Sequence, residues 1–493
     1  MAAKVYMAFD LGASNGRAIA GRFDGQNLTL EVIHRFDNPM IRLPRYQYWD
    51  ALGLFRELLQ ALRIWAARNE GNLSSVGVDT WGVDFALFGR DGTMLGNPIV
   101  YRDPFTEGVM ESLWDELGRA YIFEQTGIQF MSLNTLYQLV ALARAGAPQL
   151  EVAEQMLMMP DIFHYFLTGE RVVEFTEATT SQCFNTRAGD WAWDLIDRVG
   201  LPRRIFSPTV PPGTVVGPLR PALAEDTGVG SLQVITPASH DTGSAVAAVP
   251  AQGEDWAYLS LGTWALMGVE VRAPIISAEA LAANFTNEGG VDGTFRFLRN
   301  MTGLWPVQEC RRVWARADGQ ATGWDELTSL AAAAESFRSL IDPDDPSFLH
   351  PQDMPEAIRA YCRRVGQPVP ETRGQVLRSA LEGVALRCRV TADKLAELRG
   401  RPLHVLHIVG GGIQNRLLCQ FIANAVGLPV VAGPIEATAT GNLLVQAMAQ
   451  GDIGSLQELR EVVRRSVAPV EYTPQDTARW EDAYGKFRSL ITR

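Results

Sequence analysis

Apolar residues occur in strand-length and helix-length patterns in alternation along the whole chain, and this alternation favours an α/β protein. Two segments, residues 5–20 and residues 256–267, share one pattern: an apolar strand, a tight turn of small residues and a second apolar strand. We expect a β-hairpin from each. Because they lie at matching places in the two halves of the chain, they predict two lobes, residues 1–244 and residues 245–493.

Periodic spacing predicts the main helices and buried strands between the hairpins and after them. A helix is expected after Asp50, which is a suitable N-cap, with an apolar face made of Leu52, Phe55, Leu58, Leu62 and Trp65. A second, longer helix is expected near residues 375–398. Residues 76–88 have the composition of a buried strand region, and residues 404–409 form a strand that runs into three glycines and a helix from Asn415.

Composition excludes several classes of function. The chain has 493 residues, 47% of them hydrophobic and 20% charged, and a formal net charge of −12. An acidic protein of this kind does not suit binding to nucleic acid or to an anionic membrane, which needs a basic surface. The five cysteines are odd in number and lack CxxC spacing, and no apolar run approaches the roughly 18 residues of a membrane span. With no leader-like segment at the N-terminus, we expect a cytoplasmic protein in a reducing compartment.

The first hairpin carries the strongest local signal for chemistry. Residues 12–16 form a turn rich in small residues, where successive backbone N–H groups can surround a phosphate. Asp10, at the end of the strand, could hold Mg²⁺ through water. The segment is neither a Walker A loop nor a dinucleotide fingerprint, and an ordinary hairpin with an Asx-turn is the alternative. The turn at Gly262 and Thr263 is weak evidence for a phosphate site by itself. It becomes stronger evidence as the counterpart of the turn in the first hairpin.

A second candidate site is Ser239-His240-Asp241-Thr242, which ends an apolar strand, where open α/β sheets place their ligands. Either Asp241 or His240 could accept a proton from a substrate hydroxyl that attacks a phosphoryl group. We favour Asp241, because the proton leaves late in a loose phosphoryl transfer and an ionised carboxylate suffices. A buried structural His–Asp pair is the alternative.

Two further segments allow a functional and a structural interpretation. Gly410-Gly411-Gly412 could admit a flat adenosine ring close to the backbone, or could be a tight connection between strand and helix. Asp79 and Asp84 lie in an apolar run, so each must be paired or face a polar cavity. With Trp81 between them, a sugar site would explain both, and a core tryptophan is nearly as good an explanation. The remaining histidines have no metal-ligand spacing.

Together these segments resemble the FGGY carbohydrate kinases, in order and over essentially the whole chain. The resemblance rests on residues 10–17, 77–85, 101–103, 160–161, 167–170, 239–242, 262–264, 303–305 and 407–412. The Leu-Thr-Gly and Gly-Gly-Gly elements are shared across that family. The Asp-Thr-Trp-Gly-Val-Asp-Phe run and the Ser-His-Asp-Thr element narrow the resemblance to kinases of L-rhamnulose.

The resemblance implies a two-lobed, actin-like ATPase fold of the hexokinase type, with a ligand cleft between the lobes. It also implies conversion of ATP and L-rhamnulose to ADP and L-rhamnulose 1-phosphate in rhamnose breakdown, with Asp241 as general base and Mg²⁺ as cofactor. ATP would contact Ala13, Ser14, Asn15, Gly16, Arg17, Thr263, Gln308 and Gly411. The sugar would contact Gly82, His240, Asp241, Thr242 and Asn300, and Asp10 would face the metal through water.

Two positions depart from the family pattern: Phe105 stands where many relatives have arginine, and Asn15 where serine is common.

Two other functions stay open. The substrate could be L-fuculose, L-ribulose or D-xylulose, which differ by hydroxyl orientation and a methyl group. The protein could instead be an actin-like ATP-binding protein without catalysis, although such a protein has no need of a base at Asp241.

Overall fold

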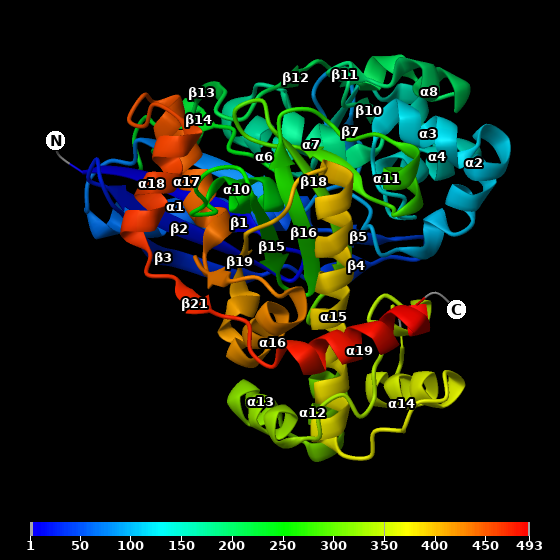
Figure 1. Ribbon diagram of the computed structural model, residues 1–493. Helices are drawn as coiled ribbons and strands as arrows, with labels where there is room; N and C mark the ends of the chain where they lie inside the picture. Colours follow the sequence, from blue (N-terminus) through cyan, green and yellow to red (C-terminus); the bar gives the residue numbers. More distant parts are fainter. Residues whose placement is uncertain (1–2, 350, 492–493) are drawn as a thin grey trace. The chain divides into compact units, whose positions relative to one another are not determined.

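The computed structural model describes residues 3–349 and 351–491, in two compact units (Figure 1). Unit 1 contains the chain up to Pro250, Glu270–Phe297 and Ala437–Val467. Unit 2 contains Ala251–Val269, Leu298–Glu436 and the chain from Ala468 onward. Each unit is therefore assembled from three separate segments, so no single position in the sequence separates the two units. The functional division at residue 244 stays a prediction.

Unit 1 is built on a six-stranded sheet in the order β13-β14-β6-β1-β2-β3. Its strands are β1 (Lys4–Leu11), β2 (Asn15–Phe23), β3 (Leu28–Asp37), β6 (Ser75–Thr80), β13 (Val215–Pro218) and β14 (Gln233–Ile235). Strand β1 pairs antiparallel with β2 and parallel with β6. The first predicted hairpin is confirmed. The predicted strand region 76–88 is two strands, because β7 (Phe85–Phe88) leaves the sheet and pairs with β8 (Gln155–Met158).

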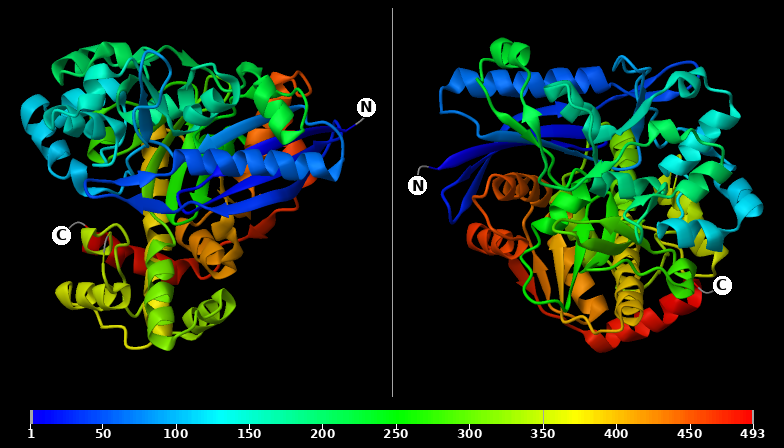
Figure 2. Two further views of the ribbon diagram at one scale, coloured as in Figure 1. Left: turned by 180° about the vertical axis from the view of Figure 1, so that it is seen from behind. Right: turned by 90° about the horizontal axis from the view of Figure 1, so that it is seen from above.

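Helices cover both faces of this sheet, as the views in Figure 2 show. Helix α1 (Ala51–Arg68) lies on one face, and α17 (Ala437–Ala449) and α18 (Leu456–Ser466) lie on the other. The other helices of unit 1 are α2 (Val109–Leu117), α3 (Arg119–Thr126), α4 (Thr135–Arg144), α5 (Pro148–Val152), α6 (Met159–Thr168), α7 (Phe175–Ala178), α8 (Trp193–Arg198), α9 (Pro221–Thr227), α10 (Asp241–Ala247) and α11 (Ala278–Ala282). Its short strands are β4 (Met40–Arg42), β5 (Gln47–Trp49), β9 (Val173–Glu174), β10 (Phe184–Asn185), β11 (Asp190–Trp191), β12 (Thr209–Val210) and β17 (Thr286–Gly289).

Helix α1 begins as predicted but buries a different face. Asp50 is its N-cap and accepts a hydrogen bond from the backbone N–H of Gly53. The predicted face was wrong at Leu52, which is 59% exposed. At 3.6 residues per turn, Leu52 lies about 120° away from Leu58 around the helix, whereas Leu54 lies about 40° from it. The buried face is accordingly Ala51, Leu54, Leu58, Ala61, Leu62 and Trp65.

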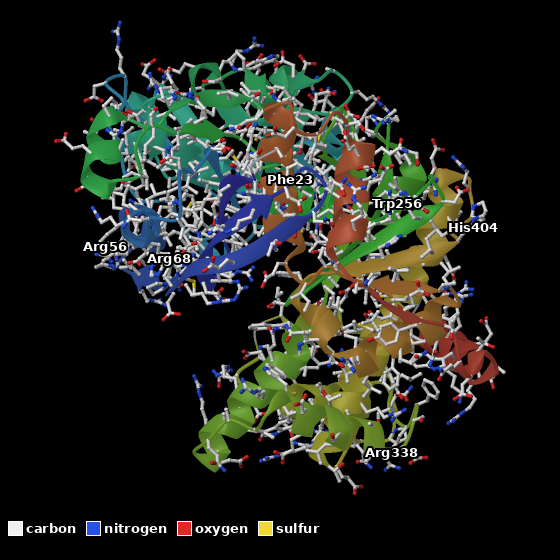
Figure 3. All side chains as sticks on the ribbon, turned by 90° about the vertical axis from the view of Figure 1, so that its left-hand side faces the viewer. Phe23, Arg56, Arg68, Trp256, Arg338 and His404 are labelled. Carbon is white, nitrogen blue, oxygen red and sulfur yellow. The ribbon has the colours of Figure 1, made fainter. Side chains whose placement is uncertain are left out.

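The core of unit 1 joins residues that are far apart in the sequence. One buried cluster combines Tyr6, Ile19 and Phe23 of the sheet with Leu443 and Leu459 from α17 and α18. In Figure 3, Phe23 lies toward these helices, whereas Arg56 marks the exposed side of α1. Burial of apolar surface therefore holds the late segment 437–467 onto the N-terminal sheet.

Unit 2 repeats the plan of unit 1 around strands that are neighbours in the order β18-β16-β15-β19-β20-β21. Strand β15 (Trp256–Leu261) pairs antiparallel with β16 (Trp264–Val271) and parallel with β19 (Val405–Val409). The remaining strands are β18 (Phe295–Thr302), β20 (Val430–Ala432) and β21 (Val470–Tyr472). The second predicted hairpin, the strand at 404–409 and the duplication are thus confirmed.

The helices of unit 2 are α12 (Trp305–Asp318), α13 (Trp324–Ala333), α14 (Met354–Arg364), α15 (Arg373–Arg399), α16 (Arg416–Val426) and α19 (Thr477–Ile491). The long helix α15, yellow in Figure 1, agrees with the prediction for 375–398. It begins with a capping box, in which Thr372 and Gln375 satisfy each other's backbone N–H groups. The helix predicted from Asn415 is α16, which has Asn415 as its N-cap.

Candidate active site

The β1–β2 turn in unit 1 is a braced loop with free donors at its tip. The backbone N–H of Gly12 donates to the carbonyl of Asn15 at 2.9 Å. Asn38 holds the turn from the side, through its backbone N–H to Ser14 at 3.1 Å and its amide to Gly12 at 3.0 Å. Within the described chain the N–H groups of Ala13 and Ser14 make no hydrogen bond, and Ser14 is exposed. These groups can bind an anion.

Two carboxylates meet at the ends of neighbouring strands beside this turn. Asp10 on β1 and Asp79 on β6 are partners in the parallel register. Arg17 donates to Asp10 Oδ2, and Asn442 of α17 donates to Asp79 Oδ2. Burial first, and then the negative charges of Asp10 and Asp241, raise the pKa of Asp79 well above its usual range. A cation bound beside Asp79 would therefore favour the ionised form of this carboxyl group.

The donor set fits Mg²⁺ bound mainly through water and phosphate. Asp79 Oδ1 is buried and accepts no hydrogen bond from the described residues. Among those same residues no group of three or more His, Cys, Asp or Glu side chains could hold a metal ion. Mg²⁺ in nucleotide sites is typically bound by one or two carboxylates together with phosphates and water, so hard oxygen donors at Asp10 and Asp79 are sufficient.

Asp241 is the first residue of α10, and the residues before it are held on both sides. The backbone N–H of Thr80 donates to the carbonyl of Ser239 at 2.9 Å. Opposite, Glu174 Oε2 accepts from the N–H of Ser239 at 3.2 Å, and Thr176 Oγ1 accepts from the N–H of His240 at 3.0 Å. The Asp241 side chain is 34% exposed. A buried structural His–Asp pair is therefore excluded.

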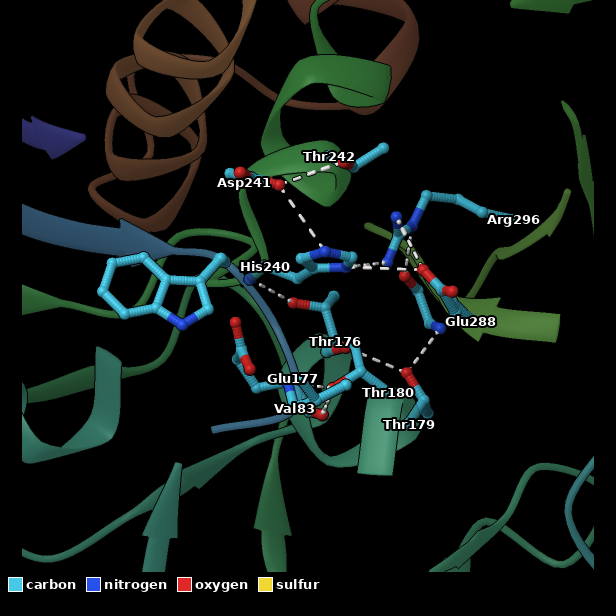
Figure 4. Close-up of polar contacts among 12 residues, drawn as sticks. Val83, Thr176, Glu177, Thr179, Thr180, His240, Asp241, Thr242, Glu288 and Arg296 are labelled. Carbon is cyan, nitrogen blue, oxygen red and sulfur yellow. Dashed lines mark hydrogen bonds and ion pairs between the residues drawn. The ribbon is translucent and has the colours of Figure 1, made fainter. Parts of the chain in front are cut away.

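His240 lies between Asp241 and a buried ion pair, as Figure 4 shows. Its Nε2 atom is 3.5 Å from Asp241 Oδ1. Its Nδ1 atom is 3.0 Å from Arg296 Nη2 and 3.4 Å from Glu288 Oε2. Thr242 Oγ1 donates to Asp241 Oδ1 at 3.0 Å. The structure thus brings together the predicted residues His240, Asp241 and Thr242.

Behind this segment lies a group of buried acids to which the sequence analysis assigned no role. Asp161, Glu174 and Glu177 are each fully buried. Burial raises the pKa of Glu174 to about 8 and holds the pKa values of Asp161 and Glu177 well above their usual range. The sequence contained a signal for these buried acids. Carboxyl groups flanked by Val173, Ala178 and other apolar residues need partners, as does Asp79 in its apolar run.

Gly82, predicted to contact the sugar, lies in a tightly constrained turn between β6 and β7. A Cβ on Gly82 would lie 2.9 Å from Thr180 Cγ2. The next residue, Val83, has φ = 71°, a conformation that a β-branched residue rarely adopts. Its N–H donates to Thr180 Oγ1 at 3.0 Å, and its carbonyl accepts from Thr135 Oγ1 at 2.6 Å. Such strain persists where its surroundings hold it in place, and it is concentrated at functional sites.

Asp84 is a structural residue and not a group facing a sugar. It is fully buried and accepts hydrogen bonds from the indoles of Trp49 at 2.6 Å and Trp81 at 2.9 Å, and from Gln138 at 3.0 Å. Burial raises the pKa of Asp84 to about 6 despite these donors. Trp81 itself is 7% exposed. Of the two interpretations left open, the structural one therefore describes Asp84 and its tryptophans.

Unit 2 groups the nucleotide residues predicted there around the β15–β16 turn. Gly262 N–H donates to the carbonyl of Trp264 at 2.8 Å and closes the turn. Thr263 Oγ1 donates to Gln308 Oε1 at 2.9 Å, so these two predicted residues are neighbours. Gly303 packs against the turn so closely that a Cβ there would lie 2.6 Å from the Gly262 carbonyl oxygen. Asn300, on β18, is half-buried.

The three glycines after β19 have different roles. Gly410 has φ = 90°, which favours glycine, and a Cβ on Gly412 would lie 2.5 Å from Leu261 Cγ. Gly411, the residue predicted to contact ATP, has open space where its Cβ would be. The glycines at 410 and 412 therefore serve the connection, and Gly411 leaves room for a ring near the backbone.

Comparison with known proteins defines the class. The model of the FGGY family of carbohydrate kinases, N-terminal domain, matches residues 5–248, and that of the C-terminal domain matches residues 257–450. The chain belongs to this family. ATP is the phosphate donor that such a sugar kinase uses.

The curated relatives are more specific. A rhamnulokinase of Bacteroides thetaiotaomicron is 47% identical over 486 residues, 99% of each chain. One of Pectobacterium carotovorum is 43% identical over 492 residues, 99% of this chain and 97% of the relative. The resemblance stated from the motifs is confirmed.

Solved structures confirm the fold. The xylulose kinase of Lactobacillus acidophilus has a TM-score of 0.82 at 16% identity, with 99% of this chain and 98% of that chain covered. Plasmodium falciparum glycerol kinase with ADP has a TM-score of 0.77 at 14% identity, with 100% and 98% covered. At such identities the likeness concerns the fold alone. None of the helices in the described chain combines the length and the hydropathy needed to cross a bilayer.

Proposed function

We propose that this kinase transfers the γ-phosphoryl group of ATP to O1 of L-rhamnulose, giving L-rhamnulose 1-phosphate and ADP in L-rhamnose breakdown. The observation that carries the proposal is full-length similarity, 47% and 43% identity, to two rhamnulokinases. The motifs at residues 79–85 and 239–242 support the same substrate. A reducing, cytoplasmic location is proposed with it, since the cysteines at 183, 310, 362, 388 and 419 are buried and unpaired in the described structure.

In the proposed reaction Asp241 is the general base. Sugar O1 attacks the γ-phosphorus, the bond from that phosphorus to the β–γ bridging oxygen breaks, and the O1 proton passes to the Asp241 carboxylate. The partly exposed carboxylate at the start of α10, with His240 and Thr242 beside it, supports this role. Gly82 and Asn300 would complete the sugar contacts.

The nucleotide would be bound by the two hairpin turns. The unpaired N–H groups of Ala13 and Ser14, with Asn15, Gly16 and Arg17, would bind phosphate oxygens. Thr263, Gln308 and Gly411 would contact the nucleotide from unit 2. Asp10 and Asp79 would hold Mg²⁺ through water, and that ion would neutralise charge on the β- and γ-phosphates. Arg17, which pairs with Asp10, would be available to phosphate once a cation faces that carboxylate.

Phosphotransfer across a panel of L-rhamnulose, L-fuculose, L-ribulose and D-xylulose tests the proposal. ADP release gives kcat/KM, and phosphorus NMR gives the position of the new phosphate. We expect the highest kcat/KM for L-rhamnulose, with phosphate on O1. A higher kcat/KM for another ketose would make that ketose the substrate and leave the protein a sugar kinase. The panel can distinguish these sugars because a protein site discriminates hydroxyl orientation far more strongly than a methyl group.

A further inference from the structure

A buried ion pair approaches the side of His240 that faces away from Asp241. Arg296 of β18 is completely buried, and Glu288 of β17 is 5% exposed. Arg296 is anchored independently of the histidine: its Nε donates to the carbonyl of Gly289 at 2.7 Å, and its Nη1 lies 3.2 Å from Glu288 Oε2. The family comparisons and the motifs assign no role to either residue. An ion pair is costly to bury, so its place beside the active site needs an explanation.

The contact with Arg296 decides which nitrogen of His240 carries the proton. A guanidinium can only donate hydrogen bonds, so Nδ1, at 3.0 Å from Arg296 Nη2, must accept. The proton of the neutral ring is then on Nε2, the atom 3.5 Å from Asp241 Oδ1. Glu288 Oε2, at 3.4 Å from Nδ1, would favour the opposite tautomer. It is the longer contact, and that oxygen already pairs with Arg296.

The charge state of Glu288 agrees with this arrangement. Burial alone would raise the pKa of Glu288, but the charge of the neighbouring Arg296 guanidinium is the largest opposing cause, and that pKa lies below its usual range. Glu288 is therefore a carboxylate that neutralises Arg296. With the guanidinium charge balanced, Arg296 acts on His240 mainly as a fixed donor.

We propose that Arg296, held by Glu288, is a positioning residue that fixes His240 as the neutral tautomer with its Nε2–H directed at Asp241. The inference rests on Asp241 being the base of the proposed reaction. His240 then has no free lone pair to accept the substrate proton, because Nδ1 is engaged by Arg296. It supplies a donor that orients the Asp241 carboxylate, which answers why the aspartate and not the histidine is the base.

Nitrogen NMR on protein labelled with ¹⁵N-histidine tests the tautomer directly. The chain has six histidines, and the variant H240Q identifies the signals of His240 by their loss. At neutral pH we expect a protonated Nε2 and a bare Nδ1 in the ligand-free enzyme. A proton on Nδ1, or on both nitrogens, would overturn the inference. This measurement needs no turnover, so it is independent of the proposed reaction.

The variant R296M tests the cause. Glu288 would then lie unpaired beside Nδ1, so we expect the His240 proton to move to Nδ1 or a second proton to bind there. We expect kcat to fall roughly tenfold or more, since the other tautomer turns a bare nitrogen toward the Asp241 carboxylate in place of an N–H, while KM for ATP is unchanged. An unchanged tautomer together with unchanged kcat would refute the role of Arg296.

Two further variants keep the test decisive. R296M/E288L removes both buried charges, which is better tolerated than an unpaired carboxylate, and should give a mixture of the two tautomers. R272M is the matched control, because Arg272 is an exposed arginine of the same segment, beside Asp292. It should leave the His240 signals and kcat as in the wild type. If D241N kept full turnover while His240 showed the Nε2–H tautomer, the assignment of Asp241 as base would fail, whereas the tautomer fixed by Arg296 would stand.

Discussion

Asp241 has the exposure and the neighbours that a base requires, so its replacement should separate chemistry from binding. The variant D241N keeps the shape of the side chain and removes the proton acceptor. We expect turnover to fall by roughly 10²–10⁴-fold. ATP affinity, measured by calorimetry, should stay at the wild-type value, because Asp241 is not among the phosphate-binding residues. Turnover near the wild-type rate would show that another group takes the proton.

Glu174 should make stability depend on pH. Its pKa is raised to about 8 by burial, so the native state keeps a proton that the unfolded chain loses above about pH 4.5. Stability from this group is therefore complete below that pH and is lost as pH rises toward 8. The variant E174Q imitates the neutral acid and does not titrate.

Urea unfolding of both proteins at several pH values measures the effect. Relative to E174Q, the unfolding free energy of the wild type should fall by about 1.4 kcal/mol for each pH unit across this window. A difference between the two proteins that is independent of pH would mean that Glu174 is ionised in the native state. Activity should survive in E174Q, since its amide oxygen can still accept from Ser239 and Thr176.

Helix α10, which begins with Asp241, is held in place by close packing on α17. A Cβ on Gly441 of α17 would lie 1.8 Å from the carbonyl oxygen of Ser244 in α10, so backbone would have to move. We expect G441A to lower the unfolding free energy by about 3 kcal/mol or more, and to lower kcat because α10 shifts.

The same substitution elsewhere provides the control. Gly485 is exposed within α19, and its Cβ would meet no atom within 4 Å. There G485A should stabilise the protein by about 0.5–1 kcal/mol through helix propensity alone, with kcat unchanged. Urea unfolding measures both variants. Equal effects at the two positions would contradict the packing argument.

The stability of unit 1 depends on a segment that begins roughly 190 residues after Pro250. Its core cluster takes Leu443, Leu444, Leu459, Val462 and Val463 from residues 437–467. A fragment of residues 1–250 should therefore fail to fold by itself, because the sheet face under α17 and α18 would be exposed to water. Circular dichroism and urea titration should show no cooperative transition.

Joining residues 437–467 to that fragment through a flexible Gly/Ser linker should restore part of the cooperativity. The added helices cover the apolar face and return Asn442 to Asp79. Cooperative unfolding of the fragment without this addition would show that the N-terminal segment is an independent domain.

Local pattern was sufficient for the hairpins at residues 5–20 and 256–267, for α15, and for the strand before Gly410, because their periodicity and caps are short-range properties. The motifs likewise identified the family, and the roles of Asp241 and of the two turns stay predictions. The helix face at Leu52 was wrong, since its rotation depends on which neighbours it packs against. Residues 76–88 formed two strands because the strained turn at Val83, held by Thr180 and Thr135, is a tertiary feature.

The linear order of residues therefore specified the α/β alternation, the duplicated hairpins and the family, and it predicts Asp241 as the reacting carboxylate. Tertiary structure specified the partners of the site residues. Glu174 and Thr176 lie beside Ser239 and His240, two indoles donate to Asp84, and Arg296 with Glu288 lies behind His240. Those contacts join strands and helices that are distant along the chain. Burial and charge at such points follow from packing, which no local periodicity encodes.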